Sequence, residues 1–190
     1  MHDIPVGRAE LAAGAGPLYT FEGTSPKIAA DAWVAPSAAV IGDVTIGSQS
    51  GIWFHCVLRG DTNFIRIGAR TNIQDGTIIH VNAGREATII GDEVTVGHSA
   101  LIHACTLENR AFVGMAATVL DGAVIEEGGM LAAGALLTPG KRIGRNELWS
   151  GSPAKLWRVM EAGERAKFDR TAVHYVELGQ RYLRGLRRSG

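Results

Sequence analysis

Cysteine, net charge and long hydrophobic runs are all scarce in this 190-residue chain. Cys56 and Cys105 are too few for a disulfide framework, and we expect both to be small buried side chains in a reducing, cytoplasmic setting. Lysine plus arginine (19) equals aspartate plus glutamate (19), which argues against a nucleic-acid surface or a basic membrane patch. No apolar run approaches the roughly 20 residues that span a bilayer. The N-terminus carries Asp3 and Glu10 and lacks the continuous apolar segment of a secretion signal.

Glycine, by contrast, is abundant at 25 residues, and aliphatic side chains recur with a period of six. The period is interrupted only by steps of nine, eleven and five residues. It runs through Ile28, Val34, Val40, Ile46, Ile52, Leu58, Ile67, Ile73, Ile79, Ile90, Val96, Ile102, Leu107, Val113, Val119, Ile125, Leu131, Leu137 and Ile143. All 19 positions are Ile, Leu or Val, although only 43 of the 190 residues are, so chance predicts about four. The sequence is therefore a hexapeptide repeat.

A helix cannot keep a period of six on one face, whereas short strands joined by tight turns can. We therefore predict an all-β solenoid in which three hexads form one coil of a triangular prism around an aliphatic core. After the repeat, Ser152-Pro153 predicts the start of a short helix over the segment PAKLWRVM. A longer helix is expected from about Glu164 to Leu186, covering the solenoid or a neighbouring subunit. Its apolar stripe contains Phe168, Ala172, Tyr175, Tyr182 and Leu186.

Assigning the hexads to the three faces in turn places polar residues on two edges of the prism. We interpret the step of nine as a hexad plus a three-residue bulge, and the step of eleven as a hexad plus a five-residue excursion. The first edge then carries Arg59, His80 and His103. The second edge carries Gln74, Asp75 and His98. One chain therefore holds two separate polar half-sites.

The three histidines are the candidate metal ligands. Neighbouring coils lie about 4.8 Å apart, so the imidazoles of His80 and His103 can bind one ion at about 2.0–2.1 Å. His98 lies on another edge, so one chain should not complete the site, whereas two chains side by side do. Three nitrogens leave a fourth position for water, the arrangement of a catalytic metal. The alternative is three hydrogen-bonded surface histidines.

Five segments carry a resemblance to a known family. They are VLRGDTNFIRIGARTNIQDGTIIHV, IGDEVTVGHSALIHACTL, VGMAATVLDGAVI, AAGALLTPGKRI and LWSGSPAK. They resemble the γ-class carbonic anhydrases and their bacterial homologues, over roughly Pro17 to Arg184. The resemblance implies a left-handed parallel β-helix over residues 17–151, a C-terminal helical segment over 152–190, and an extension over 1–16. It also implies a homotrimer with a metal ion held by His80 and His103 of one chain and His98 of the next.

The resemblance also implies roles for other residues. Arg59 and Asp75 match a pair that bridges subunits, or that only holds the trimer together, and Asp61 matches a neighbouring carboxylate. Gln74 matches the residue that hydrogen-bonds metal-bound water, and Asn72 belongs to the same TNIQD motif. Thr62, however, stands where the archetypal member has glutamate, and the excursion VNAGREATI is short, with Glu86 its one acidic residue. The glutamates that shuttle protons in the archetype are therefore not matched.

The leading functional hypothesis is reversible hydration of CO2 to bicarbonate by metal-bound hydroxide, with zinc expected and Fe2+ or Co2+ also accepted by three imidazoles. A second hypothesis is an acyl-CoA thioesterase or acyltransferase, because many hexapeptide solenoids are CoA-dependent acyltransferases. A third is a non-catalytic trimer that serves in binding or assembly. Fold alone does not separate these classes.

Overall fold

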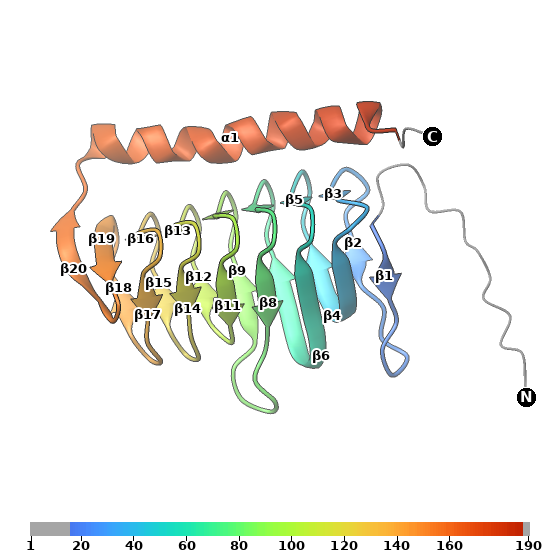
Figure 1. Cartoon of the computed structure of the whole chain (residues 1–190), viewed down its shortest axis with the longest axis horizontal. Coiled ribbons are helices and arrows are strands. Elements are labelled where there is room, and N and C mark those ends of the chain that lie inside the picture. Colours follow the sequence, from blue (N-terminus) through green and yellow to red (C-terminus); the bar gives the residue numbers. More distant parts are fainter. Residues whose placement is uncertain (1–15, 188–190) are drawn as a thin grey trace, which may run out of the picture.

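Short parallel strands stack in three ladders along one axis, and a single helix lies along the side of the stack (Figure 1). The computed structural model describes residues 16–187, so residues 1–15 of the expected N-terminal extension lie outside the described part. The fold class predicted from the repeat, a β-solenoid of hexapeptide repeats with a C-terminal helix, is confirmed.

Each ladder collects strands from successive coils. The first contains β2 (Lys27–Ile28), β9 (Thr88–Ile90), β12 (Thr106–Leu107), β15 (Val124–Ile125) and β18 (Arg142–Ile143). The second contains β3 (Trp33–Val34), β5 (Gly51–Ile52), β7 (Asn72–Ile73), β10 (Thr95–Val96), β13 (Phe112–Val113), β16 (Met130–Leu131), β19 (Glu147–Gly151) and β20 (Ala154–Val159). The third contains β1 (Leu18–Tyr19), β8 (Ile78–His80), β11 (Leu101–His103), β14 (Thr118–Val119) and β17 (Leu136–Leu137). The long strands β4 (Ala39–Ile46) and β6 (Val57–Ile67) pair with members of both the third and the first ladder.

The strand register confirms the assignment of hexads to faces. In the third ladder Leu58 pairs with Ile79, and Ile79 pairs with Ile102. In the second ladder Ile73 pairs with Val96. The bulge and the five-residue excursion are therefore accommodated at the edge of the prism and do not shift the aliphatic columns.

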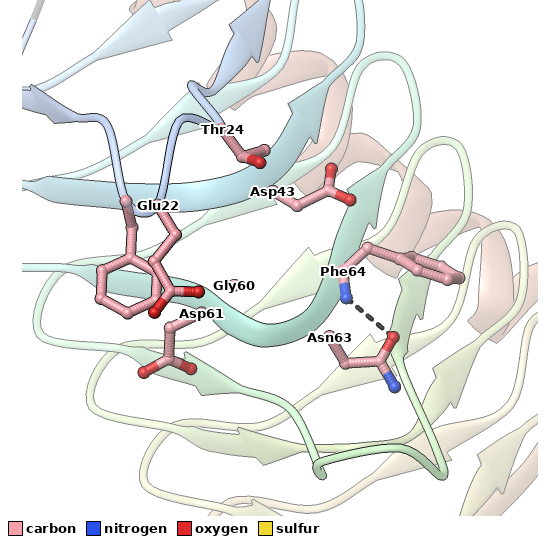
Figure 2. A pocket seen from close by; sticks show the side chains of 8 residues that line it. Glu22, Thr24, Asp43, Gly60, Asp61, Asn63 and Phe64 are labelled. Atoms are coloured by element: carbon pink, nitrogen blue, oxygen red, sulfur yellow. Dashed lines mark hydrogen bonds between the residues drawn. The ribbon is translucent and has the colours of Figure 1, made fainter.

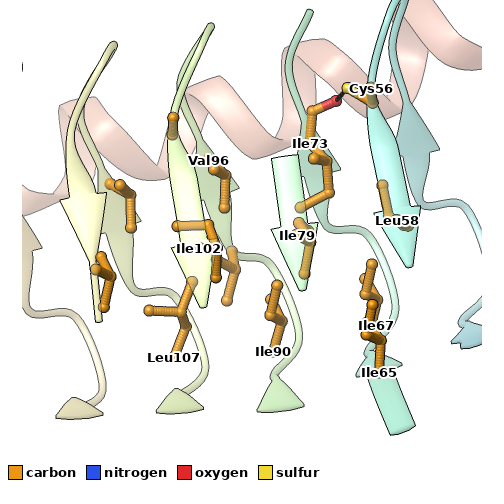
Figure 3. Close-up of a cluster of buried hydrophobic side chains, with 14 of the residues drawn as sticks. Cys56, Leu58, Ile65, Ile67, Ile73, Ile79, Ile90, Val96, Ile102 and Leu107 are labelled. Atoms are coloured by element: carbon orange, nitrogen blue, oxygen red, sulfur yellow. Dashed lines mark hydrogen bonds between the residues drawn. The ribbon is translucent and has the colours of Figure 1, made fainter. Parts of the chain in front are cut away.

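The repeated aliphatic side chains point inward and form the core (Figure 3). Of the 19 repeat positions, all except the half-buried Ile28 are exposed by 3% or less. Where coils turn a corner their backbones approach closely: a Cβ on Gly47 would lie 2.6 Å from the backbone of Gly68. A side chain does not fit there, which explains why a small residue so often follows the aliphatic one.

Helix α1 (Ala162–Gly185) starts at the last coil and runs back along the solenoid toward its first coils (Figure 1). Its predicted apolar stripe is confirmed, since Tyr175 and Tyr182 pack against Trp53 with ring centroids 5.0 and 5.3 Å apart. Within residues 16–187 no helix has the length and apolarity needed to cross a membrane.

The predicted short helix over PAKLWRVM is wrong. Residues Ala154–Val159 instead form β20, which pairs antiparallel with β19 after a turn at the cis Ser152–Pro153 bond. Serine followed by proline is common both in turns and at helix starts. The free edge of β19 supplies hydrogen-bond partners for the backbone of residues 154–159, and the helix propensity of the segment does not take these tertiary partners into account. The predicted division between residues 151 and 152 falls within this hairpin and stays a prediction.

Both cysteines are buried and free, as expected, and burial raises the pKa of each thiol to about 12. Because the thiolate is the reactive species, neither thiol should react in the folded protein at pH 8. We expect an aromatic disulfide reagent to label two thiols per chain only after unfolding in denaturant. Labelling of the native protein at the rate of a free thiol would contradict this burial.

Candidate functional site

The insertions of the repeat lie next to the histidine edge. The bulge lies within β6, where the register with β4 shifts, and brings Asp61 and Asn63 outward. The excursion connects β8 to β9 and begins just after His80. Both interrupt the solenoid where β8 and β11 end, so polar groups from several coils meet at one edge.

His80 and His103 are brought together as the repeat predicts. They pair in register at the ends of β8 and β11, and their rings lie 5.2 Å apart between centroids. The Nδ1 atom of His80 is 3.3 Å from the Nε2 atom of His103. Their side chains are 20% and 29% exposed, so an ion can reach these nitrogens while the surrounding coils hold the rings.

In each ring the nitrogen that does not face the other histidine, called the outer nitrogen here, contacts a carboxylate. Asp61 Oδ1 lies 3.0 Å from His80 Nε2, and Asp121 Oδ2 lies 3.1 Å from His103 Nδ1. Burial raises the pKa of both carboxyls, but other contacts outweigh it, so both pKa values are lowered: hydrogen bonds from Arg59 and then His80 act on Asp61, and hydrogen bonds from the backbone and then His103 act on Asp121. Ionised carboxylates only accept hydrogen bonds, so the outer nitrogens carry the protons. When both imidazoles are neutral, the two nitrogens that face each other carry lone pairs, and a cation between them stabilises this arrangement.

His98 lies on the second edge and has a similar environment. Its Nδ1 atom is 2.9 Å from Asp75 Oδ2, and its Nε2 atom is 3.5 Å from the hydroxyl of Tyr175 on α1. The structure therefore confirms that Asp75 and His98 share an edge. All three candidate ligands have one ring nitrogen held by a carboxylate, the usual support of a metal-binding histidine.

Gln74 and Asn72 are buried beside this second edge. Gln74 Nε2 donates to Asn72 Oδ1 at 2.9 Å, and Asn72 Nδ2 donates to the Thr95 hydroxyl at 2.9 Å. The amide of Gln74 is thus held in one orientation by a chain of hydrogen bonds across two coils.

The two half-sites stay apart within one chain. Among residues 16–187 no group of three His, Cys, Asp or Glu side chains is arranged to hold a metal ion. Arg59, on the first edge, forms an ion pair with Asp61, while its family-implied counterpart Asp75 pairs with His98. Thr62 and Glu86 are exposed, and neither side chain forms a hydrogen bond among the described residues.

An open acidic pocket borders the first edge. Its lining comprises Phe21, Glu22, Thr24, Asp43, Gly60, Asp61, Asn63 and Phe64. Figure 2 shows Glu22, from the turn after β1, on the same side of the pocket as Asp61. The carboxylate that contacts His80 therefore also faces solvent through this pocket.

Sequence reasoning missed Asp121 and Asn82. Asp121 accepts hydrogen bonds from His103 and, through Oδ1, from Asn82 Nδ2 at 2.8 Å. The register gives a partial signal: Val119 pairs with Ile102, so the turn that follows β14, which contains Asp121, lies beside the end of β11 and His103. The sequence places Tyr175 on the apolar stripe of the helix but gives no indication of its contact with His98.

The chain is similar in sequence to known proteins and in structure to solved ones. The mitochondrial gamma carbonic anhydrase 2 of Arabidopsis thaliana is 52% identical over 161 residues, which are 82% of this chain and 58% of the relative. The chain thus spans less than two thirds of the length of that relative. A carbonic anhydrase of Geobacillus kaustophilus is 41% identical over 165 residues, covering 87% of this chain and 90% of the relative.

A crystal structure of a hexapeptide transferase family protein from Anaplasma phagocytophilum has the same fold. It is 48% identical, superposes with a TM-score of 0.83, and the match covers 87% of this chain and 97% of that one. No protein-family model matches the chain.

Proposed function

Because the chain belongs to the γ-class carbonic anhydrase family, we propose that it catalyses the reversible hydration of CO2 to bicarbonate with a bound metal ion. The observation that carries this proposal is the pair of ring nitrogens, one from His80 and one from His103, that lie 3.3 Å apart while an aspartate contacts the other nitrogen of each ring. Metal chemistry of this kind requires neutral imidazoles with a fixed tautomer.

The donor set fits a tetrahedral metal ion. Two ligand nitrogens, each about 2.05 Å from a tetrahedral zinc ion, lie about 3.4 Å from each other, close to the spacing of His80 and His103. Bound zinc supplies a water ligand whose pKa is about 7 and thus a nucleophile at neutral pH. We propose zinc, although imidazoles also accept Fe2+ and Co2+. Metal analysis of the purified protein should find one zinc ion per chain, and a different ion at full stoichiometry would overturn this choice.

We further propose that the protein is a homotrimer and that His98 of a neighbouring chain completes each site. The proposal is supported by the distribution of ligands, two on the first edge and one on the second, each with its own aspartate. In this assembly Arg59 and Asp75 lie at the junction of the two chains. The buried amide of Gln74, held by Asn72, is then available to orient a water molecule beside His98.

Proton removal must follow each hydration event. Asp61 lies between His80 and the acidic pocket and is positioned to receive a proton at a carboxylate oxygen. Thr62 and the exposed Glu86 supply no match to the archetypal shuttle. We therefore propose that release to solvent depends on buffer and that turnover rises with buffer concentration.

Acyl-CoA chemistry is the second candidate, favoured by the Anaplasma relative that is named a hexapeptide transferase family protein.

A cytoplasmic location stays a prediction from the sequence, and the Arabidopsis relative is named mitochondrial.

The decisive experiment measures CO2 hydration by stopped flow and acyl-CoA cleavage by thiol release on the same zinc-loaded preparation. We expect CO2 hydration that falls to the uncatalysed rate after chelation and returns with zinc. Cleavage of an acyl-CoA without CO2 hydration would support the second candidate. Absence of both activities in a metal-loaded trimer would favour the non-catalytic alternative.

A further inference from the structure

Asp121 is held in place by the solenoid itself. It lies in the turn between β14 and β15, one coil after His103, and is followed by Gly122 at a φ of +65°. The backbone N–H of Gly122 donates to the carbonyl of Ala104 at 2.7 Å, which ties this turn to the coil of His103. Glycine is the residue best suited to that left-handed backbone conformation.

Each oxygen of the Asp121 carboxylate has its own side-chain partner. Oδ2 faces His103 Nδ1 at 3.1 Å, and Oδ1 accepts from Asn82 Nδ2 at 2.8 Å. The carbonyl of Asn82 in turn accepts from Asn63 Nδ2 at 3.1 Å. The bulge, the excursion and the following coils are therefore joined by one chain of hydrogen bonds that ends on the imidazole of His103.

We propose that Asp121, oriented by Asn82, is a positioning residue that fixes the ring orientation and tautomer of His103. The proton on Nδ1 is held toward Asp121, and Nε2 is left with a free lone pair directed at His80. The inference rests on the proposed function, because it assigns His103 as a metal ligand. It also gives the five-residue excursion a role, since Asn82 belongs to it.

The first test measures Co2+ and Zn2+ affinity of the full-length protein by competition with a chelator of known affinity. Carboxylates behind metal-binding histidines contribute about 10–100-fold to metal affinity. We expect Asp121→Ala to weaken binding by about that factor, and Asn82→Ala to weaken it less because Asp121 retains its charge. Asp31→Asn is the matched control: Asp31 also accepts a hydrogen bond from a neighbouring coil, from Ser48 at 2.7 Å, but lies away from the histidines. It should bind metal as the wild-type protein does.

The second test reads the tautomer of His103 by 15N NMR of the metal-free protein. In the wild-type protein Nδ1 should carry the proton, and in Asp121→Ala the population should shift toward the Nε2-protonated form. An unchanged melting temperature shows that the variant is folded. Equal affinity and an unchanged tautomer in Asp121→Ala would overturn the inference. If the wild-type chain binds neither metal, the proposed function fails, while the tautomer of His103 still decides the role of Asp121.

Discussion

Alanine at His80 is expected to abolish tight metal binding and CO2 hydration, and alanine at His98 is expected to do the same. Each substitution removes one of the three nitrogen ligands. At the first edge the carboxylates left after His80→Ala stay engaged, Asp61 with Arg59 and Asp121 with His103. Loss of a ligand should exceed the about 10–100-fold effect of losing a supporting carboxylate. Metal content after dialysis and the hydration rate measure the result.

Mixing the two variants is expected to restore part of the activity. His80→Ala spoils the first edge of its chain and leaves the second intact, and His98→Ala does the reverse. When the variants are unfolded together and refolded, every mixed trimer contains one junction at which an intact first edge meets an intact second edge. One site in three should therefore bind metal in each mixed trimer.

A matched control comes from the partner of His80. Mixing His80→Ala with His103→Ala should restore nothing, because both lesions lie on the first edge and no junction is repaired. If the mixture of His80→Ala and His98→Ala also stays inactive and free of metal, the proposal that each site is shared between two chains is wrong.

Ile90→Ala is expected to lower the free energy of unfolding by about 2–5 kcal/mol. Ile90 is 2% exposed and stacks between Ile67 and Leu107 in one aliphatic column (Figure 3). Truncation leaves a cavity that the coils above and below cannot fill, because their backbones are joined by ladder hydrogen bonds. Urea unfolding at a fixed protein concentration measures the loss.

The neighbouring residue supplies the control. Ile89 lies on the same strand, points outward and is 44% exposed, so Ile89→Ala should change stability by about 0.5 kcal/mol or less. Equal losses for the two substitutions would show that the column is not the main source of stability.

The architecture was predictable because the repeat reports it directly. One aliphatic side chain per hexad must point inward, and coils stack only in a register that keeps these side chains in columns. Counting hexads was therefore enough to place His80 beside His103 and Asp75 beside His98, despite interruptions of different lengths. The apolar stripe of α1 was predictable for the same reason, because a helix that buries one face repeats apolar side chains with the period of the helix.

Other features depended on contacts that no local pattern records. The segment after Pro153 became β20 because the free edge of β19 lay beside it. Asp121 and Asn82 meet 39 residues apart in sequence, and only the stacking of coils brings the carboxylate to His103. Periodicity assigns a residue to an edge, whereas side-chain hydrogen bonds are decided by how neighbouring coils and their insertions fold over that edge.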